Sequence, residues 1–294
     1  MNSELSMTVR GRLLSFSRPL VMGIVNATPD SFHAPSRAID NAAELVQQMR
    51  ADGADIIDVG ACSTRPGSQP CNEEEELRRL QTVVPAVFSA WPEAIVSVDT
   101  FRPAVARHAV QTLGVHIIND VGAPADVTDT TDVSAAGNEE CAQAGTLLSP
   151  MMAEAVRLGV PYILMSRART VADMLPWLSA RVEAMHALGH RDIIIDPGFG
   201  FGRSREEDLQ LLAQLDRLQV LQLPLLVGLS RKRMAWQTLG TTPNDSLPAT
   251  IALNALAVER GAAILRVHDV REAVQVATIV PSVVRKCLTC ACRR

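Results

Sequence analysis

The chain has 294 residues, of which 47% are hydrophobic and 20% are charged, so it is long enough to bury a large core. Its formal net charge of −4 gives no basic excess, which argues against nucleic acid as a partner. No segment approaches the ~20 uninterrupted apolar residues that span a bilayer, and the opening MNSELSMTVR lacks a signal-peptide pattern, so we expect a cytoplasmic protein with no membrane partner.

Eight short runs rich in Ile, Val and Leu recur along the chain, separated by segments with helical periodicity. Their apolar character is continuous rather than alternating, which is typical of parallel strands covered on both faces. The runs are 20–26, 54–60, 94–100, 115–120, 161–166, 192–196, 224–230 and 263–269. Eight such strand–helix units favour an α/β fold that closes into a (β/α)8 TIM barrel, because an open doubly wound sheet more often stops at ~6 strands.

Several helix ends carry capping signals. Asn72 precedes a run of acids and leucines, and Ser204 precedes a second amphipathic stretch that continues to 219, so both are predicted N-caps. Gly261 is a predicted C-cap, and the last helix is expected over 271–284.

The remaining segments complete a single domain. The opening VRGRLLSFS (9–17) is predicted to form a hairpin that closes the bottom of the barrel. We expect one domain over 1–294, with a core of about 19–284 and a short disordered tail at 285–294. The polar, weakly periodic stretch 122–150 is interpreted as a long loop after the fourth strand, partly helical near NEECAQAG, and either an active-site lid or an insertion.

The six cysteines do not form a disulfide scaffold at this length. Cys287, Cys290 and Cys292 cluster without a fourth metal ligand nearby, which favours a reduced, solvated tail. Cys62 is interpreted as a small neutral loop residue rather than a redox-sensitive thiol.

Nearly every predicted strand ends in a hydrogen-bonding or ionisable side chain. A lone residue of this kind is by default a cap for the next helix, but in a barrel all of these positions converge on the carboxyl-terminal mouth, where barrel enzymes have their sites. The residues are Asn26, Asp58, Asp99, Asn119, Ser166, Asp196, Ser230 with Lys232, and Arg266 with His268. This convergence predicts an enzyme.

The chemistry of these residues divides them into two sets. The set Asp99, Asn119, Asp196 and Lys232 would match a flat heterocycle with an amidine-like edge. The set Arg65, Arg266 and His268, with Asn26 and Thr64, suits a phosphate or pyrophosphate. GFGFG (198–202) lacks the spacing of a dinucleotide loop, and its Phe201 suits the wall of a pocket for a planar ring. Together the sets indicate transfer from a phosphorylated precursor.

Seven blocks of sequence carry a resemblance to a known family. They are VMGIVNATPDSF, GADIIDVGACSTRPGS, VSVDT, IINDV, IIIDPGFGFGR, LLVGLSRKRM and LRVHDV. From about residue 20 to 280 the chain resembles dihydropteroate synthase. The resemblance implies a transferase of folate biosynthesis, a target of sulfonamides, that condenses 6-hydroxymethyl-7,8-dihydropterin pyrophosphate with p-aminobenzoate to give 7,8-dihydropteroate and pyrophosphate. It also implies Mg²⁺ as cofactor, a homodimer, and a dissociative mechanism.

The resemblance further implies roles for individual residues. The pterin site would comprise Asp99, Asn119, Met165, Asp196 and Lys232. The pyrophosphate site would comprise Asn26, Thr64, Arg266 and His268, with Asn26 also a metal ligand. The aminobenzoate pocket would comprise Arg65, Pro66, Phe201, Lys232 and Arg233. The residues expected to be catalytic are Asp99, Asp196, Lys232, Arg266 and His268.

The sequence departs from the family pattern in places, and two alternatives stay open. Ala34 stands where many members have an Asp, and Ser166 stands where the fifth strand usually ends in a His. One alternative is a pterin-dependent methyltransferase, which has no need for the intact STRPG and SRKR. The other is a non-catalytic pterin-binding paralogue, and the retained pyrophosphate residues argue against it.

Overall fold

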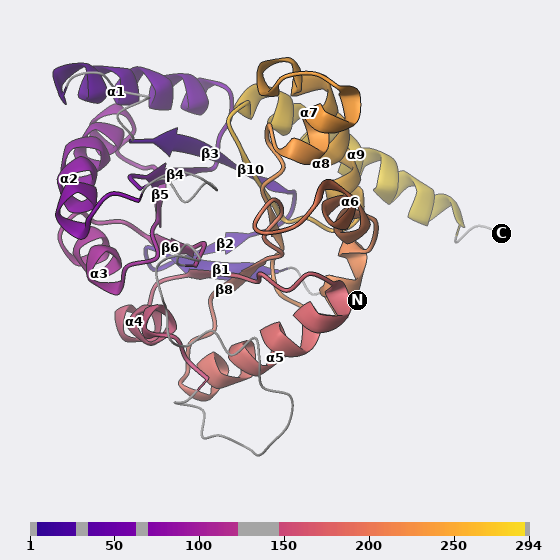
Figure 1. Cartoon of the computed structure of the whole chain (residues 1–294), viewed down its shortest axis with the longest axis horizontal. Coiled ribbons are helices and arrows are strands. Elements are labelled where there is room, and N and C mark those ends of the chain that lie inside the picture. The colour runs from indigo at the N-terminus through magenta and orange to yellow at the C-terminus, as the bar shows by residue number, and fades with distance from the viewer. Residues whose placement is uncertain (1–4, 28–34, 63–69, 123–146, 292–294) are drawn as a thin grey trace.

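The computed structural model describes residues 5–27, 35–62, 70–122 and 147–291, with side chains from 41 onward in the first helix and up to 284 in the last. Figure 1 shows a ring of helices around a central set of strands. Two strands form an N-terminal hairpin, β1 (Ser6–Val9) and β2 (Arg12–Ser15). The other strands are β3 (Leu20–Asn26), β4 (Ile56–Gly60), β5 (Ile95–Asp99), β6 (Ile117–Asp120), β7 (Tyr162–Met165), β8 (Ile193–Asp196), β9 (Leu226–Val227) and β10 (Ile264–Val267).

These eight strands are parallel and form a barrel in the order β8-β7-β6-β5-β4-β3-β10-β9. A parallel bridge between Ile195 and Leu225 joins β8 to the chain just before β9 and completes the ring. The α-helices are α1 (Pro35–Ala51), α2 (Glu73–Ala90), α3 (Pro103–Gln111), α4 (Pro150–Leu158), α5 (Val171–Ala187), α6 (Arg205–Ala213), α7 (Arg233–Leu239), α8 (Leu247–Glu259) and α9 (Val270–Ala291), with short 3-10 helices η2 (Leu215–Leu221) and η3 (Pro243–Asp245). The predicted (β/α)8 barrel is confirmed.

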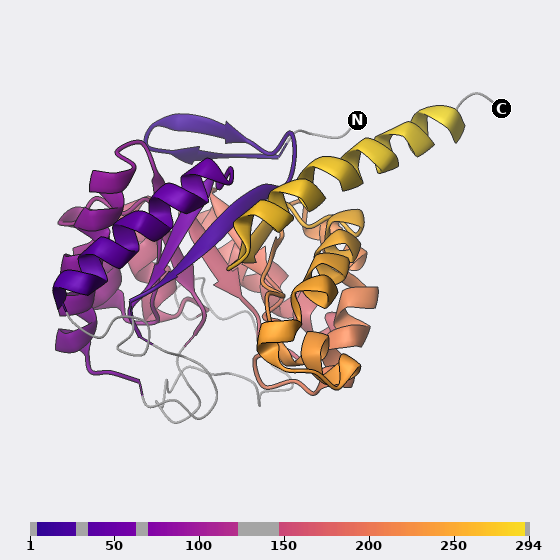
Figure 2. The same ribbon diagram turned by 90° about the horizontal axis from the view of Figure 1, so that it is seen from above.

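Two predicted helix ends were wrong. The helix predicted over 204–219 ends at Ala213 and continues as η2, whose tighter turn places Leu215 and Leu218, three residues apart, in the core. The last helix does not stop at Val284 but runs to Ala291, because no glycine or proline interrupts the sequence there. Figure 2 shows α9 projecting away from the barrel.

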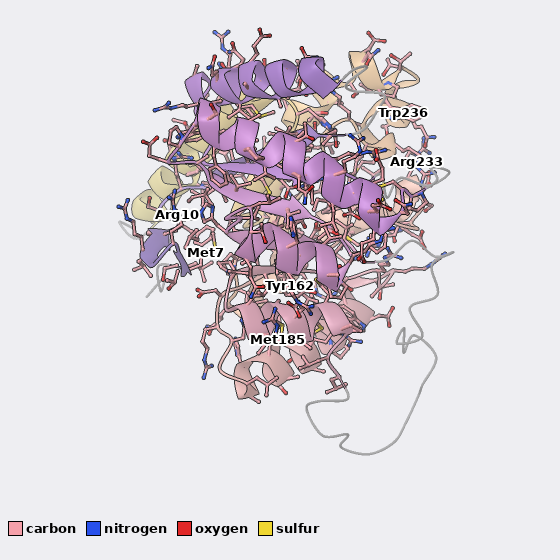
Figure 3. All side chains as sticks on the ribbon, turned by 90° about the vertical axis from the view of Figure 1, so that its left-hand side faces the viewer. Met7, Arg10, Tyr162, Met185, Arg233 and Trp236 are labelled. Atoms are coloured by element: carbon pink, nitrogen blue, oxygen red, sulfur yellow. The ribbon has the colours of Figure 1, made fainter. Side chains whose placement is uncertain are left out.

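The N-terminal hairpin seals the lower end of the barrel, as predicted, although it starts at Ser6 rather than at Val9. Its turn has positive φ at Arg10 (54°) and Gly11 (69°), the geometry of a tight two-residue hairpin turn. Met7 and Val9 point inward and are only 2% and 4% exposed. Figure 3 shows Met7 and Arg233, at the start of α7, at opposite ends of the molecule.

The barrel interior has an apolar lower half and a polar upper half. Side chains alternate along each strand between this interior and the surrounding helices. In β4, for example, Ile56 faces the interior, Ile57 and Val59 pack under the helices, and Asp58 lies above Ile56. The lower layer comprises Leu20, Met22, Ile56, Ile117, Ile163, Ile194, Leu226 and Ile264, packed against Met7 and Val9. The strand ends above it are free to carry polar groups.

The two predicted N-caps are confirmed. The side chain of Asn72 accepts a hydrogen bond from the backbone N–H of Glu75 at the start of α2. Ser204 and Glu207 form a reciprocal capping box at α6. The C-cap of α8 is Arg260 rather than the predicted Gly261, which lies one residue further on with φ of 96°. None of the described helices combines the length and apolar character that crossing a bilayer requires.

Candidate active site

Arg266, on β10, lies at the centre of a network of charged groups at the barrel mouth. Its Nε donates to Asp58 Oδ2 at 2.7 Å, and a second guanidinium nitrogen donates to Asp99 Oδ2 at 2.6 Å. Asn119 Nδ2 donates to the same Asp58 oxygen at 3.1 Å. The side chains of Asp58 and Asp99 are 0% and 12% exposed, so the network is largely withdrawn from water. Strands β4, β5, β6 and β10 are thereby joined through their interior side chains.

Burial sets the protonation of this network. Desolvation raises the pKa of Asp99 to about 7, against the lowering effect of Arg266. The pKa of Arg266 is raised despite burial, because Asp58 and Asp99 both stabilise its positive charge. One oxygen each of Asp58, Asp99 and Asn119 is buried without a hydrogen-bond partner among the described residues. The site therefore offers acceptors to a ligand that has N–H groups to donate.

Asp196, at the end of β8, lies at the same mouth. Its Oδ1 accepts a hydrogen bond from the backbone N–H of Gly198 at 2.7 Å, and the residue is 7% exposed. Gly198 has φ of 70°, and a Cβ built on it would lie 2.5 Å from the carbonyl oxygen of Ser166, so the turn requires glycine. Burial raises the pKa of Asp196, and Lys232 opposes that effect. A buried carboxylate close to Lys232 is thus held at the rim.

Lys232 reaches this site from the start of α7. Its Nζ donates to the backbone carbonyl of Phe199 and lies 5.0 Å from the ring centroid of Phe201. Burial lowers the pKa of Lys232 to about 8, although Asp196 favours the charged form. A Cβ built on Gly228 would lie 3.9 Å from Arg266 Cβ and 4.0 Å from Lys232 Nζ. Side-chain atoms of Arg266 and Lys232 therefore lie close to the same point.

Asn26, at the end of β3, completes the described part of the mouth. A Cβ built on Gly60 would lie 3.7 Å from Asp99 Oδ2 and 3.9 Å from Asn26 Oδ1, so these oxygens flank the same point. Asn26 is half-buried beside the acid–arginine network.

His268, which was predicted for the anion site, follows β10 and contacts Ser230. The hydroxyl oxygen of Ser230 is 3.1 Å from His268 Nδ1 and accepts the backbone N–H of His268 at 3.3 Å. Arg231, with φ of 55°, forms a two-point ion pair with Asp269. Arg233 is exposed, and its guanidinium donates to the carbonyl of Arg203 at 3.3 Å.

Several predictions on individual residues concern the edges of the site. Thr64, Arg65, Pro66 and Ala34 lie outside the described residues. Met165 is 6% exposed beside Asp196 in the β7–β8 register. Ser166, where the family has His, is fully buried, and its hydroxyl accepts the backbone N–H of Ala168 at 3.2 Å. The serine therefore shapes the turn after β7.

Three residues make contacts that the sequence analysis did not predict, although it named Asp58 among the strand ends at the mouth. Asp58 is the shared acceptor of Arg266 and Asn119. Asp208 accepts the backbone N–H of Gly200 at 3.0 Å and so fixes the glycine loop that carries Phe201. Arg203 is 2% exposed and donates to the carbonyls of Gly198 and Ala168. In the sequence, the signal for the role of Asp58 was its charge within an otherwise apolar strand.

Comparison with known proteins agrees with this geometry. A family model described as "Pterin binding enzyme" matches residues 22–268, so the chain belongs to the pterin-binding enzymes. The dihydropteroate synthase of Escherichia coli (strain K12) is 36% identical over 286 residues, which cover 92% of this chain and 94% of that protein. A dihydropteroate synthase of Streptococcus pyogenes is 35% identical over 273 residues, 89% of this chain and 94% of that protein.

Solved structures give the same result. A Xanthomonas albilineans dihydropteroate synthase with 4-aminobenzoic acid superposes with a TM-score of 0.79 at 35% identity, covering 96% of this chain and 98% of that one. A Yersinia pestis dihydropteroate synthase in a sulfonamide drug complex gives 0.78 at 32% identity, with 96% and 100% covered. Within the pterin-binding enzymes, the chain belongs to the dihydropteroate synthases, transferases of folate biosynthesis.

Proposed function

We propose that the mouth described above condenses 6-hydroxymethyl-7,8-dihydropterin pyrophosphate with p-aminobenzoate. The observation that carries this proposal is the pairing of buried acids with cations around one space: Asp99 with Arg266, and Asp196 beside Lys232. The ring acceptors and the anion-binding cations that the reaction needs are next to one another.

The pterin ring would lie against the acids. Asp196 and the unpartnered oxygens of Asp99 and Asn119 would accept hydrogen bonds from ring N–H groups. The apolar layer below them has no side-chain acceptors to offer. Lys232 donates to a ring oxygen or nitrogen from the other side. Satisfying these buried atoms gives the ring its affinity and its orientation.

The pyrophosphate would lie toward Asn26 and His268, with Arg266 between it and the ring. Mg²⁺ prefers oxygen ligands and keeps few protein contacts when phosphates are present, so the amide oxygen of Asn26 beside Asp99 fits it. The ion, when bound, would supply positive charge that helps the pyrophosphate leave. Arg266 and His268 add to that neutralisation and hold the leaving group in line.

We infer that bond cleavage precedes attack. Departure of pyrophosphate leaves a cation at the methylene carbon, and the negative charges of Asp99 and Asp196 stabilise it. Arylamines are weakly basic, so aminobenzoate attacks in its neutral form and requires no dedicated general base. Phe201 and Arg233, with Arg65 and Pro66 from outside the described residues, are proposed to hold it.

The direct test mixes pterin pyrophosphate, aminobenzoate, Mg²⁺ and protein, and measures dihydropteroate by chromatography. We expect product, its loss when chelator removes Mg²⁺, and competition by a sulfonamide against aminobenzoate. Slow release of pyrophosphate without aminobenzoate would support the dissociative order. Release that depends strictly on aminobenzoate would contradict it.

The same assay separates the alternatives. A non-catalytic paralogue would bind pterin pyrophosphate and form no product. A methyltransferase would use a methylated folate and a corrinoid, and the match to dihydropteroate synthases over most of the chain favours the synthase. The homodimer and the cytoplasmic location stay predictions.

A further inference from the structure

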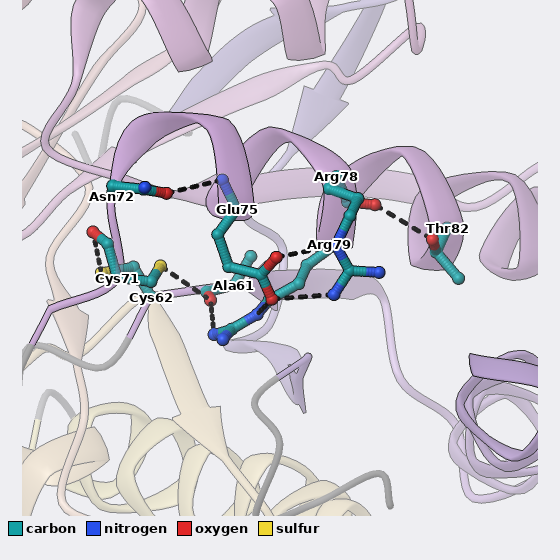
Figure 4. Close-up of polar contacts among 8 residues, drawn as sticks. All are labelled: Ala61, Cys62, Cys71, Asn72, Glu75, Arg78, Arg79 and Thr82. Carbon is teal, nitrogen blue, oxygen red and sulfur yellow. Dashed lines mark hydrogen bonds and ion pairs between the residues drawn. The ribbon is translucent and has the colours of Figure 1, made fainter. Parts of the chain in front are cut away.

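Two cysteines face each other at the base of the chain segment that follows β4. Cys62 lies just after the strand, and Cys71 lies two residues before α2. Their sulfur atoms and a carboxylate oxygen of Glu76 all lie within 4.8 Å of one another. Each thiol points to the backbone across from it: Cys62 Sγ is 3.9 Å from the carbonyl oxygen of Cys71, and Cys71 Sγ is 3.7 Å from that of Ala61 (Figure 4).

Arginines hold both sides of this cysteine pair in place. Arg79 donates to the carbonyl oxygen of Ala61 at 2.8 Å, beside Cys62. Arg102 donates to the carbonyl oxygen of Cys71 at 2.6 Å and forms an ion pair with the fully buried Glu76. The backbones that carry the two thiols are therefore held from both sides, with the sulfur atoms within 4.8 Å of each other.

The charges around the pair argue against a metal ion. Three possible ligands lie together in the described part of the chain, whereas structural zinc sites with thiolates use four. The carboxylate of Glu76 is already neutralised by Arg102, and Arg79 lies close by as a second cation. A disulfide is uncharged and needs none of these groups to move.

We propose that Cys62 and Cys71 form a reversible disulfide that cross-links the two ends of segment 63–70. The oxidant is a low-molecular-weight disulfide, RSSR. The half-buried Cys71 attacks it as the thiolate and releases one RS⁻, giving a mixed disulfide. The thiolate of Cys62 then attacks the Cys71 sulfur and displaces the second RS⁻. Two protons leave the cysteines and two RSH form, so the balance is two thiols plus RSSR to one protein disulfide plus two RSH.

The cross-link acts on the segment that contains Thr64, Arg65 and Pro66 in the sequence. Its effect on aminobenzoate rests on the proposed function, because Arg65 and Pro66 are proposed aminobenzoate residues. We expect the oxidised protein to have a KM for aminobenzoate changed severalfold and an unchanged affinity for the pterin.

The chemical test uses a variant in which Cys141, Cys287, Cys290 and Cys292 are all replaced by Ser, equilibrated with reduced and oxidised glutathione. After alkylation and proteolysis, mass spectrometry should find the peptides of Cys62 and Cys71 linked, with two hydrogens lost. The midpoint of oxidation should not depend on protein concentration. Burial and the hydrogen bond to Cys62 raise the pKa of Cys71 to about 12, so the exchange should accelerate as the pH rises.

Several outcomes would overturn the proposal. They are glutathione adducts without a link, a midpoint that shifts with protein concentration, or one Zn²⁺ bound per chain that protects both thiols from oxidation. The wild-type protein gives the same mass measurement without any substitution, so a poorly folded variant does not decide the result. Cys62→Ser and Cys71→Ser should each abolish the link and keep the activity of the reduced protein.

The effect of the cross-link on the KM for aminobenzoate is measured separately. A link that forms without changing the KM for aminobenzoate would overturn the regulatory part of the proposal. A protein that links its cysteines but makes no dihydropteroate in either state would count against the proposed function instead, and would leave the cross-link established.

Discussion

Asp58 is the residue whose importance is least visible in the sequence. It is fully buried, and one of its oxygens accepts hydrogen bonds from both Arg266 and Asn119. An aspartate at that position could equally have capped the next helix. Only the pairing of β10 with β3, and of β3 with β4, places Arg266 against it.

Replacement of Asp58 by Ala should destabilise the protein by about 3 kcal/mol, at the lower end of the usual cost of breaking a buried ion pair, because Asp99 still pairs with Arg266. Urea unfolding followed by circular dichroism measures this. Glu259→Gln is the matched control: Glu259 is 57% exposed and pairs with its sequence neighbour Arg260, so its loss should cost under about 0.5 kcal/mol. Equal midpoints for the two variants would contradict the role of Asp58.

Lys232 should impose a pH dependence on both stability and activity. Its pKa in the folded protein is about 8, below the ordinary value of 10.5, so between these pH values the unfolded chain binds more protons than the folded one. The contribution of Lys232 to the free energy of unfolding should therefore rise with pH across that window. Activity should fall above about pH 8, as the cation that holds the pterin is lost.

The measurement compares kcat/KM for pterin pyrophosphate and unfolding midpoints, from pH 6 to 10, in wild type and Lys232→Arg. The arginine variant stays charged and should lack both effects. A wild-type profile that is flat between pH 7 and 9 would show that Lys232 does not titrate there.

Among the elements, the hairpin β1–β2 contributes core side chains from outside the barrel. Replacement of Met7 by Ala leaves a cavity against the lower layer and should cost about 2–5 kcal/mol, with activity kept below the melting temperature. Leu13→Ala, on the same hairpin but 73% exposed, should change the unfolding midpoint little. Thermal unfolding of both variants distinguishes them, and matching melting temperatures would mean that the hairpin does not seal the barrel.

The barrel strands were largely predictable because each repeats one pattern, in which a run of apolar residues ends in a polar side chain. All eight barrel strands fall within their predicted runs. β3 has the predicted bounds, and the other seven are shorter, since pairing stops where the chain turns. The same pattern predicted the polar residues at the strand ends, Asp99, Asn119, Asp196 and Arg266. What the local pattern does not encode is which exit meets which across the barrel, so the Asp58–Arg266 pair and the loop contacts of Arg203 and Asp208 were not found.

At the scale of the whole molecule, α9 projects from the barrel (Figure 2). Ile279 and Val283 are 62% and 57% exposed, and Leu256 on the adjacent α8 is 42% exposed. This is the surface on which we expect the predicted homodimer to form. Val283→Glu should shift the wild-type dimer to monomer in sedimentation velocity, whereas Thr278→Glu, on the same helix, should do so less. A wild-type protein that sediments as a monomer would contradict the prediction.

The ion pair between Arg266 and Asp58 spans 208 residues of sequence, and that between Arg266 and Asp99 spans 167. During synthesis on the ribosome, the two aspartates therefore emerge long before their shared cation. A growing chain that ends before β10 would bring two carboxylates toward one another without the guanidinium that pairs with both, which disfavours premature collapse of the half-made barrel. Addition of β10 supplies this positive charge, so we expect the ligand-binding mouth to assemble only after the last barrel strand has been made.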